Sequence, residues 1–384
     1  MIFSNKYIDY SSKTKKELYE TLILFRILSN KKIVSLSKIL LKIALILRLP
    51  ILFIVKRTVF KHFCGGEDII SSQNTIINLG RHNIKTILDY SVEGKSEEKS
   101  FKKTYKEIIK NLEEASENKL IPFCVFKITG IARFKLLKKL DKEEKLSREE
   151  ELEFMLVVER LQKICKKASR KKIPILIDAE ESWIQNTIDQ LAEDMMKIYN
   201  KNDVIIYNTI QLYRWDKLGY IKELHEKAKK HNYKLGLKLV RGAYMEKERM
   251  RAKTNKYKCP IHRTKISCDQ DYNTAAAYCI DNIHNINLCF GTHNEKSTEI
   301  IIQLMKTKKL LNNDPRIYFS QLLGMSDNIS FYLGHFNYNV AKYVPYGPVK
   351  EVLPYLIRRA EENSAISGQT NREIIRIKEV IKTF

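Results

Sequence analysis

The chain has 384 residues, 44% of them hydrophobic and 30% charged, with only 13 Gly and 8 Pro. These proportions fit one large domain or two ordinary ones, and they exclude a disordered, collagen-like or low-complexity protein. The 69 Lys and Arg against 45 Asp and Glu give a net charge of +24. The basic residues are spread along the chain, which favours a diffuse solvated surface over a nucleic-acid-binding arm. The seven Cys never form a C-x-x-C pair, which argues against a disulfide framework and favours a reducing compartment.

The N-terminal part of the chain predicts helices but neither a signal peptide nor a membrane span. The segment Met1–Glu20 is polar and charged, without the apolar core of a cleavable signal. The apolar run Ile39–Val55 has 17 residues and contains Lys42, Arg48 and Pro50, so it is too short and interrupted to cross a bilayer. We favour an amphipathic helix that docks on the rest of the fold. Contact with an anionic membrane surface stays open as the alternative.

From residue 84 onward, short β-branched runs alternate with longer charged stretches of helical period. Eight segments have the strand pattern: Ile84–Ser91, Pro122–Thr129, Ile173–Glu180, Asp203–Ile210, Tyr233–Val240, Ile286–His293, Arg316–Leu323 and Asn339–Tyr346. Most intervals between them can hold a helix, such as Glu149–Arg170 or Ser182–Tyr199. This alternation predicts an α/β fold with a parallel sheet, and eight units in about 300 residues predict a (β/α)₈ barrel.

Active sites of such barrels lie at the carboxyl ends of the strands. Polar residues occur at seven predicted strand ends: Asp89, Lys127, Asp178 with Glu180, Gln211, Arg241 with Tyr244, His293 with Asn294, and Gln321. Any one of them could be a helix cap, but seven together indicate a lined pocket. The sequence contains no G-x-G-x-x-G, phosphate loop, H-E-x-x-H or G-x-S-x-G motif, so Rossmann, nucleotide-triphosphatase, zinc-protease and serine-hydrolase sites are not predicted.

The strongest local pattern is YVPYGPVKEVLPYLIRRAEENS, residues 343–364. A helix over Leu353–Asn363 would place four side chains on one face, namely Tyr355, Arg358, Arg359 and Glu362. Two adjacent guanidinium groups suit a small carboxylate, because Arg binds carboxylates in bidentate fashion. A solvated stripe of Glu–Arg pairs explains the same spacing equally well from the residues alone.

Six motifs together resemble the proline dehydrogenase family. They are LIDAEES (176–182), YNTIQLY (207–213), KLVRGAYMEKERMRA (238–252), GTHNEKS (291–297), FSQLLGMSD (319–327) and KYVPYGPVKEVLPYLIRRAEENS (342–364). The resemblance is closest to the monofunctional form. It also includes FKHFCGGE (60–67) and ILDYSVEGK (87–95). The chain has no room for the DNA-binding and aldehyde dehydrogenase modules of bifunctional members, so we expect no nucleic-acid partner.

The resemblance implies a fold and a reaction. The fold is a distorted (β/α)₈ barrel that binds FAD without a Rossmann domain, here a helical arm over residues 1–83 and a catalytic barrel over 84–384. The barrel would end in a substrate-binding helix over 351–364. The reaction is the first step of proline catabolism, in which L-proline loses the C5 hydride to flavin N5 and becomes 1-pyrroline-5-carboxylate. Electrons would then pass to a membrane quinone.

The resemblance also assigns residues, position by position. The substrate-binding set is Arg358 and Arg359 for the carboxylate, Lys127 paired with that carboxylate or with Asp178, and Leu239, Tyr244, Tyr343 and Tyr355 around the ring. The FAD-binding set is Asp178, Ala179, Gln211, Lys238, Val240, Gly242, Ala243, Thr292, His293, Asn294, Gln321, Arg359 and Glu362. At Gly242, a backbone without Cβ could approach a flat cofactor closely. No general base is assigned, because the neutral amine can be the reacting form. No metal is assigned, because the eight His are scattered along the chain.

Two positions depart from the family pattern, and two other functions stay open. Cys268 stands where Thr is common, and Asn337 stands where we expect Gly. A hydroxyproline dehydrogenase would share these motifs, but the retained bulk of Tyr343 favours proline. A basic barrel that binds nucleic acid or membrane without catalysis is the alternative from another class. We expect a cytoplasmic protein, with peripheral attachment at the inner face of the membrane as an open question.

Overall fold

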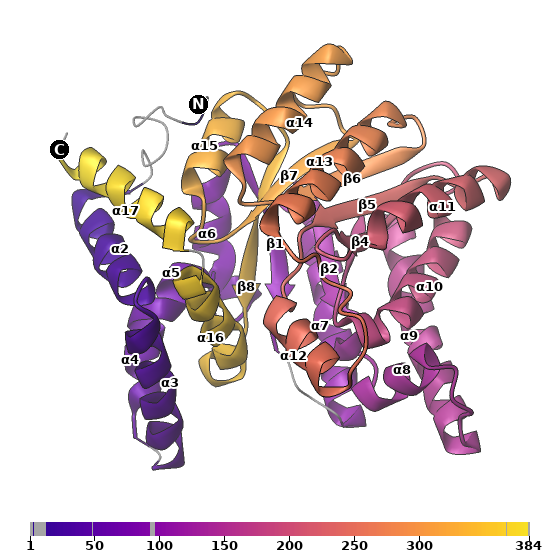
Figure 1. Cartoon of the computed structure of the whole chain (residues 1–384), viewed down its shortest axis with the longest axis horizontal. Helices are drawn as coiled ribbons and strands as arrows, with labels where there is room; N and C mark the ends of the chain where they lie inside the picture. Colours follow the sequence, from indigo (N-terminus) through magenta and orange to yellow (C-terminus); the bar gives the residue numbers. More distant parts are fainter. Residues whose placement is uncertain (1–2, 4–12, 48, 93–96, 366, 383–384) are drawn as a thin grey trace. The chain divides into compact units, whose positions relative to one another are not determined.

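The structure is a computed structural model, and it describes residues 3, 13–47, 49–92, 97–365 and 367–382 (Figure 1). The side chains of residues 42, 363–365 and 367–372 are not included in this description. Arg48 and residues 93–95 of the motif 87–95 lie outside it. The chain divides into two compact units. The first unit comprises Met1–Glu93, Gln321–Phe336 and Lys342–Phe384, and the second comprises Gly94–Ser320 and Asn337–Ala341.

Eight strands form a closed barrel in which each strand neighbours the next along the chain. They are β1 (Ile84–Tyr90), β2 (Phe123–Lys127), β3 (Ile175–Asp178), β4 (Ile206–Gln211), β5 (Leu235–Val240), β6 (Ile286–Gly291), β7 (Ile317–Leu322) and β8 (Val340–Tyr346). The registered pairs from β2 to β7 are parallel. Seven strands lie within the predicted segments and β4 extends one residue further, so the predicted barrel is confirmed.

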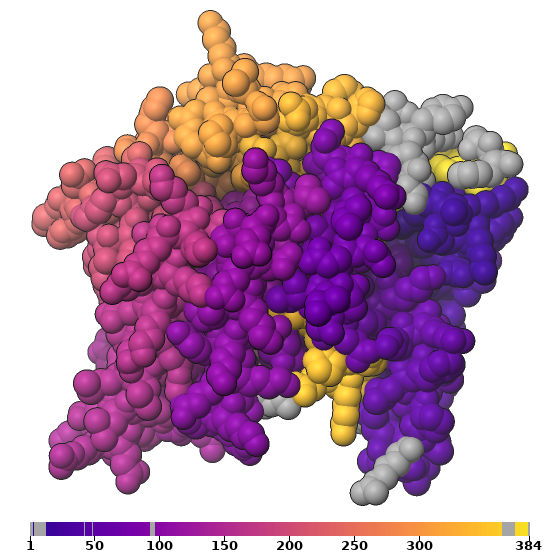
Figure 2. All heavy atoms as spheres, turned by 180° about the vertical axis from the view of Figure 1, so that it is seen from behind, coloured from indigo at the N-terminus to yellow at the C-terminus, as the bar shows by residue number. Residues whose placement is uncertain are grey.

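The second unit contains the helices that lie between β1 and β7 in the sequence. They are α7 (Glu98–Glu117), α8 (Phe134–Asp141), α9 (Arg148–Lys171), α10 (Ser182–Tyr199), α11 (Lys217–Lys230), α12 (Met245–Thr254), α13 (Lys265–Asp281) and α14 (Glu295–Thr307), with the short 3₁₀ turn η2 (Ile128–Gly130) after β2. The side chain of Ser147 accepts a hydrogen bond from the backbone of Glu150 at the start of α9, which fixes where that helix begins. Figure 2 shows the outer surface of several of these helices from behind.

Inside the second unit, aromatic rings fill the barrel toward the amino ends of the strands. The ring of Phe123 on β2 lies 5.5 Å from that of Tyr207 on β4 and 4.9 Å from that of Tyr318 on β7, centroid to centroid. These strands are not neighbours, so the three rings meet across the interior. A Cβ on Gly236 would lie 2.7 Å from the ring of Tyr207, so only glycine fits beside it. Polar side chains follow toward the carboxyl ends, where the candidate site lies.

The first unit joins helices from both ends of the sequence. They are α2 (Lys15–Leu28), α3 (Lys31–Ile46), α4 (Ile51–Val55), the π-helical turn η1 (Lys56–Phe60), α5 (Lys61–Phe63), α6 (Ile69–Gly80), α15 (Asp327–His335), α16 (Val349–Ala365) and α17 (Ser367–Ile381). Figure 1 shows α2 beside α17 and α3 beside α16. Leu18, Phe25, Phe63, Leu356 and Ile377 belong to one shared apolar core. The predicted N-terminal arm therefore packs against the C-terminal helices.

The apolar run Ile39–Val55 is divided between α3 and α4, rather than forming one helix. The break contains Pro50, which lacks the N–H that a continuous helix needs. Leu41 and Leu45 of α3 pack against the apolar core, as an amphipathic docking helix would, but the opposite face of α3 stays exposed. Among the described residues, no helix is long and apolar enough to span a bilayer.

Candidate active site

A buried ion pair lies inside the barrel of the second unit. The Nζ of Lys238 on β5 contacts the Oδ1 of Asp178 at the end of β3, and the two side chains are 6% and 16% exposed. Because β4 separates β3 from β5, this contact crosses the interior. Thr209 of β4 is in register with Lys238, and Lys127 of β2 is in register with Asp178. The structure thus brings three predicted residues to one level, and Lys238 forms an ion pair with Asp178.

The end of β3 is fixed by hydrogen bonds to both neighbouring strands. Gln211 of β4 is buried, and its Nε2 donates to the carbonyl oxygen of Glu180 at 2.7 Å. The carboxylate of Glu180 accepts from the backbone N of Thr129 at 3.0 Å and from its hydroxyl. Burial raises the pKa of Glu180 to about 7, although the two hydrogen bonds from Thr129 act to lower it. Ala179 is buried between these groups, so Asp178 projects from a rigid strand end.

The turn after β5 requires glycine for a reason that the sequence does not reveal. Gly242 has φ of +138°, and a Cβ there would lie 2.6 Å from the ring of Tyr213. The close approach that we predicted toward a flat cofactor is therefore, in this structure, an approach to a tyrosine ring. Ala243 is exposed and Tyr244 is half-buried at the start of α12. The turn is held against the end of β4.

Helix α12 is anchored to the start of α10 by one carboxylate. Glu248 is fully buried, and its two oxygens accept from the backbone N and the hydroxyl of Ser182, both at 2.6 Å. The guanidinium of Arg251 lies 4.4 Å from the ring of Trp183, one residue further along α10. These contacts hold the helix that follows Tyr244, and the sequence prediction did not include them.

Arg241, at the end of β5, connects three elements and was not in the predicted binding set. Its Nε donates to Asp269 of α13 at 2.7 Å, and its two Nη atoms donate to Thr292 at 2.9 Å and to Ser297 of α14 at 2.8 Å. The guanidinium also lies 4.4 Å from the ring of Tyr272. The signals in the sequence were its polar side chain at a predicted strand end and its place inside the motif 238–252. Arg241 positions Thr292, one of the predicted FAD residues.

Other residues near α13 and α14 that the sequence analysis singled out make structural contacts within the protein. The Oδ1 of Asn294 accepts from the backbone N of Ser297 at 3.2 Å and so caps α14, and His293 beside it is half-buried. Cys268 packs with Tyr213 and Ile261 in a small apolar cluster. Burial raises the pKa of Cys268 to about 11, so it remains a neutral thiol that packs as an apolar side chain.

Not every predicted residue of β5 faces the interior. Strand alternation places Val240 on the face of Lys238, whereas Leu239, which is fully buried, lies on the other face. The structure does not bring Leu239 together with the ion pair. A Cβ on Gly291 of β6 would lie 2.8 Å from Val240 Cγ1. A side chain at position 291 would therefore clash with Val240, and this part of the barrel wall consists of backbone alone.

In the first unit, α16 carries a buried polar face. The helix is longer than the predicted Leu353–Asn363. Arg359 is only 6% exposed, and its Nη2 donates to Glu362 Oε1 at 2.6 Å. Its guanidinium lies 5.1 Å from the ring centroid of Tyr355, and Arg358 is half-buried beside it. Burial raises the pKa of both Tyr355 and Glu362. The spacing therefore belongs to a buried face, and the alternative of a solvated stripe is wrong for Tyr355 and Arg359.

The N-terminal motif 60–67 lies against this face. The backbone N of Gly65 donates to Pro345 O at 2.8 Å, and a Cβ there would lie 2.4 Å from the side chain of Val344. This close approach places Cys64 in the same apolar core as Tyr355. The hydroxyl of Tyr355 is buried and has no hydrogen-bond partner among the described residues.

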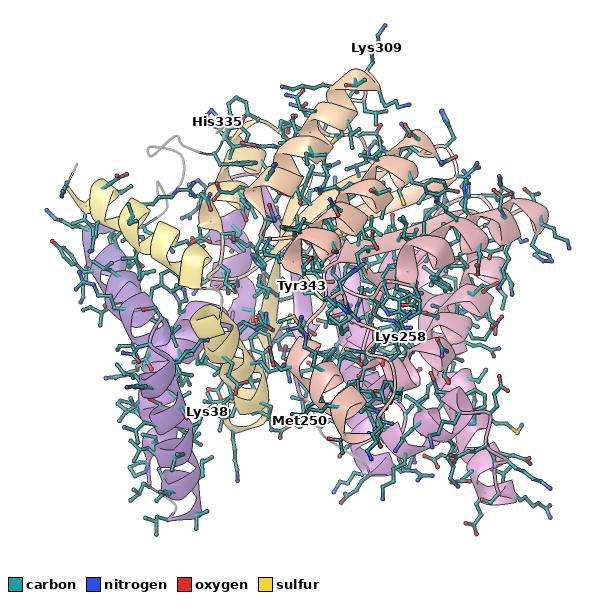
Figure 3. The ribbon with its side chains drawn as sticks, viewed as in Figure 1. Lys38, Met250, Lys258, Lys309, His335 and Tyr343 are labelled. Atoms are coloured by element: carbon teal, nitrogen blue, oxygen red, sulfur yellow. The ribbon has the colours of Figure 1, made fainter. Side chains whose placement is uncertain are left out.

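Gln321 and Tyr343 complete the predicted set of the first unit. The Oε1 of Gln321 accepts from the hydroxyl of Ser330 on α15 at 2.8 Å. Tyr343, labelled in Figure 3, is 7% exposed on β8. Its neighbour Lys342 donates outward to Met325 O at 2.6 Å and to Asp327 at 2.9 Å. Alternation therefore directs Tyr343 to the inner face of the strand.

The donor set of the second unit fits a large polar cofactor better than a metal. The described residues contain no group of three or more His, Cys, Asp or Glu that could hold a metal ion. The hydroxyl of Thr209, in register with Lys238, is buried without a hydrogen-bond partner among them. An electron-rich flat ring would fit three features of this site. They are the buried ammonium of Lys238, the unsatisfied hydroxyl of Thr209 and the lack of a side chain at Gly291.

Comparisons with known proteins identify a family. Residues 72–372 match the family model described as "Proline dehydrogenase". "Proline dehydrogenase 1, mitochondrial" of Dictyostelium discoideum is 32% identical over 97% of this chain and 73% of its own length. "Carbapenem antibiotics biosynthesis protein CarD" of Pectobacterium carotovorum is also 32% identical, over 81% of this chain and 80% of its own.

A solved structure gives the same fold. Proline utilization A (PutA) from Bdellovibrio bacteriovorus, inactivated by N-propargylglycine, aligns with a TM-score of 0.73 at 18% identity. The alignment covers 94% of this chain and 39% of the PutA chain, so this chain spans about two fifths of that protein. At this identity the likeness concerns the fold.

Proposed function

This chain belongs to the proline dehydrogenase family, and we propose that it oxidises L-proline to 1-pyrroline-5-carboxylate with FAD as the hydride acceptor. The observation that carries the proposal is the buried guanidinium of Arg359 on α16, within the segment that matches the family model. A cation that is buried in a barrel protein and pre-oriented by Glu362 suits a small anionic substrate. The reaction would be the first step of proline catabolism.

The substrate carboxylate is bound by Arg358 and Arg359. Bidentate binding fixes both the position and the rotation of a small ring, which orients its C5–H bond. Tyr343 and Tyr355 pack against the ring and exclude water, and their buried positions support this role. Tyr244 at the start of α12 closes another side. Lys127 assists the carboxylate, and Leu239 supports the pocket through packing behind β5.

No side chain is needed as a general base. The carboxylate of Asp178 is paired with Lys238, and that of Glu180 accepts two hydrogen bonds from Thr129, so neither is poised to remove the amine proton. L-proline with a neutral amine is the reacting form. The protein contributes orientation and electrostatics, and FAD supplies the two-electron redox chemistry when it is bound.

Residues at the strand ends hold the FAD. The set that we propose is Asp178, Ala179, Gln211, Lys238, Val240, Gly242, Ala243, Thr292, His293, Asn294, Gln321, Arg359 and Glu362. The ammonium of Lys238 would temper negative charge on the flavin ring, and Gln211 would hydrogen-bond to the ring edge. The electron acceptor is a quinone of a membrane, to which the protein attaches peripherally from the cytoplasm.

Dye reduction by the FAD-reconstituted protein tests this function. We expect L-proline to support reduction of a soluble artificial acceptor and 4-hydroxyproline to support much less, since Tyr343 crowds the substituted carbon. Equal turnover of both substrates would favour the hydroxyproline alternative. Turnover of neither substrate by fully flavinated protein would contradict the proposal.

A further inference from the structure

The first unit exposes an unusual amount of apolar surface on α3 and α4. Ten large apolar side chains between Ile33 and Ile54 are at least 42% exposed, and Ile46 reaches 79%. We call these ten side chains the α3–α4 apolar face. Contiguous exposed apolar surface on a folded protein marks a site of contact with another protein or with a membrane.

The exposed side chains of α3 form one face of the helix. Leu36, Leu40, Ile43 and Leu47 recur at intervals of three and four residues, which brings them onto one side. The opposite side carries Val34, Leu41 and Leu45, which pack against the apolar core. One face thus holds α3 to the protein, and the other is equally apolar and faces outward.

The segment that contains α3 and α4 carries basic residues and no acidic ones. Residues 21–66 contain nine Lys and Arg and no Asp or Glu. Three of these lysines pair with glutamates from outside the segment, Lys38 with Glu361, Lys56 with Glu67 and Lys61 with Glu20. Arg26, Lys31, Lys32 and Arg57 are exposed. The guanidinium of Arg57 lies 4.1 Å from the ring of Phe53, so positive charge borders the apolar face directly.

A second exposed apolar stripe shows that exposure alone does not identify the partner. Leu152, Met155 and Leu156 on α9 are 45–66% exposed at helical spacing. The first turn of that helix carries Glu149, Glu150 and Glu151, so its surroundings are acidic. The two stripes are alike in apolar character and opposite in charge. Of these two stripes, the α3–α4 apolar face is the one that matches an anionic partner.

We propose that the α3–α4 apolar face docks on an anionic membrane, with its apolar side chains among the acyl chains and its basic residues against the headgroup phosphates. A second copy of this chain is a poorer occupant, because a dimer through this face would bring two acid-free basic segments together. The proposal deepens the proposed function, on which it rests for its biological use, since the quinone acceptor proposed there is dissolved in the membrane. The observations that carry it are independent of the reaction.

Vesicle flotation tests the proposal with a matched pair of variants. One variant carries Leu40→Ser and Ile43→Ser on α3, and the control carries Leu152→Ser and Met155→Ser on α9. We expect wild type and the control to float with phosphatidylcholine vesicles that contain about 30% phosphatidylglycerol, and less with pure phosphatidylcholine. The α3 variant should bind about tenfold more weakly or worse, and added salt should weaken wild-type binding.

Three results would overturn the proposal. They are equal loss of binding in both variants, no vesicle binding by wild type, and a wild-type dimer in light scattering that only the α3 variant dissociates, which would identify a second copy as the occupant. Proline-dependent dye reduction without vesicles reports on the reaction separately and should be unchanged in both variants. Absence of dye reduction together with normal flotation would contradict the proposed function and leave the membrane contact standing.

Discussion

The Nη2 of Arg359 donates to Glu362 Oε1 at 2.6 Å, three residues further along α16 and on the same buried face. Burial raises the pKa of Glu362, and the two guanidinium groups of Arg359 and Arg358 act in the opposite direction. The pair therefore holds the Arg359 guanidinium in a fixed orientation before any substrate arrives. Arg358 is half-buried, whereas Arg359 is buried.

This difference predicts different consequences for two matched substitutions. Arg358→Met and Arg359→Met should each lower kcat/KM for proline by about 30- to 1000-fold, corresponding to about 2–4 kcal/mol for a lost charge-assisted contact. Only Arg359→Met should also lower the Tm, because it leaves the half-buried carboxylate of Glu362 without its cation. Steady-state kinetics and thermal melts measure both effects. The control is Lys350→Met, a substitution of an exposed residue on the same helix. A kcat/KM near the wild-type value in either Arg variant would show that this Arg does not bind the carboxylate.

Tyr343→Ser tests substrate specificity. Loss of ring packing should lower kcat/KM for proline, while the added space and hydroxyl should admit 4-hydroxyproline. Exclusion by bulk alone is worth about 1–3 kcal/mol, so the ratio of the two kcat/KM values should shift by about 5- to 150-fold. Kinetics with both substrates at equal flavin content measure the ratio. An unchanged ratio would show that Tyr343 is a packing residue.

The Lys238–Asp178 pair predicts a strong energetic coupling. Lys238→Met leaves a carboxylate inside the barrel without its cation, which should lower the free energy of unfolding by about 3 kcal/mol. The double variant Lys238→Met with Asp178→Asn should recover at least about 1 kcal/mol of that loss. Urea unfolding followed by circular dichroism gives these values. The exposed pair Lys163–Glu159 is the control, and removing either of its charges should change the stability little. Additive losses at 238 and 178 would show that the two charges do not interact.

Glu373 of α17 predicts a pH dependence of stability. Its carboxylate accepts from the backbone N of Ser326 at 2.8 Å. Burial and the charge of Asp327 raise its pKa from 4.5 to about 7, against Lys342 and Lys13. The folded state then binds this proton more tightly than the unfolded state. The stabilising contribution is full below pH 4.5 and is lost as the pH rises through about 7.

Glu373→Gln should therefore flatten the stability profile. His62 has the opposite effect on the pH dependence of stability, because burial lowers its pKa from 6.5 to about 4. The stability profile of the wild type alone therefore gives only the sum of the two effects. The difference between wild type and Glu373→Gln in urea unfolding isolates the glutamate. That difference should favour the variant increasingly between pH 4.5 and 7. A difference that is constant with pH would mean that Glu373 titrates normally.

The eight strands were predictable because strands of a buried parallel sheet are short and mostly apolar, as in Phe123–Lys127 and Ile175–Asp178. The helical face of Tyr355 and Arg359 was predictable from its spacing. The expectation of glycine at position 337 also has a physical reason, since Asn337 has φ of 58° in the left-handed region that asparagine tolerates. Asn337 therefore preserves the left-handed backbone conformation that glycine would adopt at this position.

Other features could not be read from the sequence because they depend on distant contacts. The partners of Arg241 lie 28 to 56 residues away on two helices and a strand end. The need for glycine at 242 comes from Tyr213, which belongs to another strand end. The apolar run Ile39–Val55 looked like one docking helix, and only the structure shows which of its faces is exposed.

The central claim is that this protein is a flavoenzyme that takes a hydride from proline, and anaerobic addition of L-proline to the purified protein tests it most directly. We predict a yellow protein whose oxidised flavin absorbance is bleached by L-proline and recovers when a quinone is added. Arg359→Met, once loaded with FAD, should bleach far more slowly. A protein that cannot be reconstituted with FAD, or a bound flavin that proline leaves oxidised, would contradict the account.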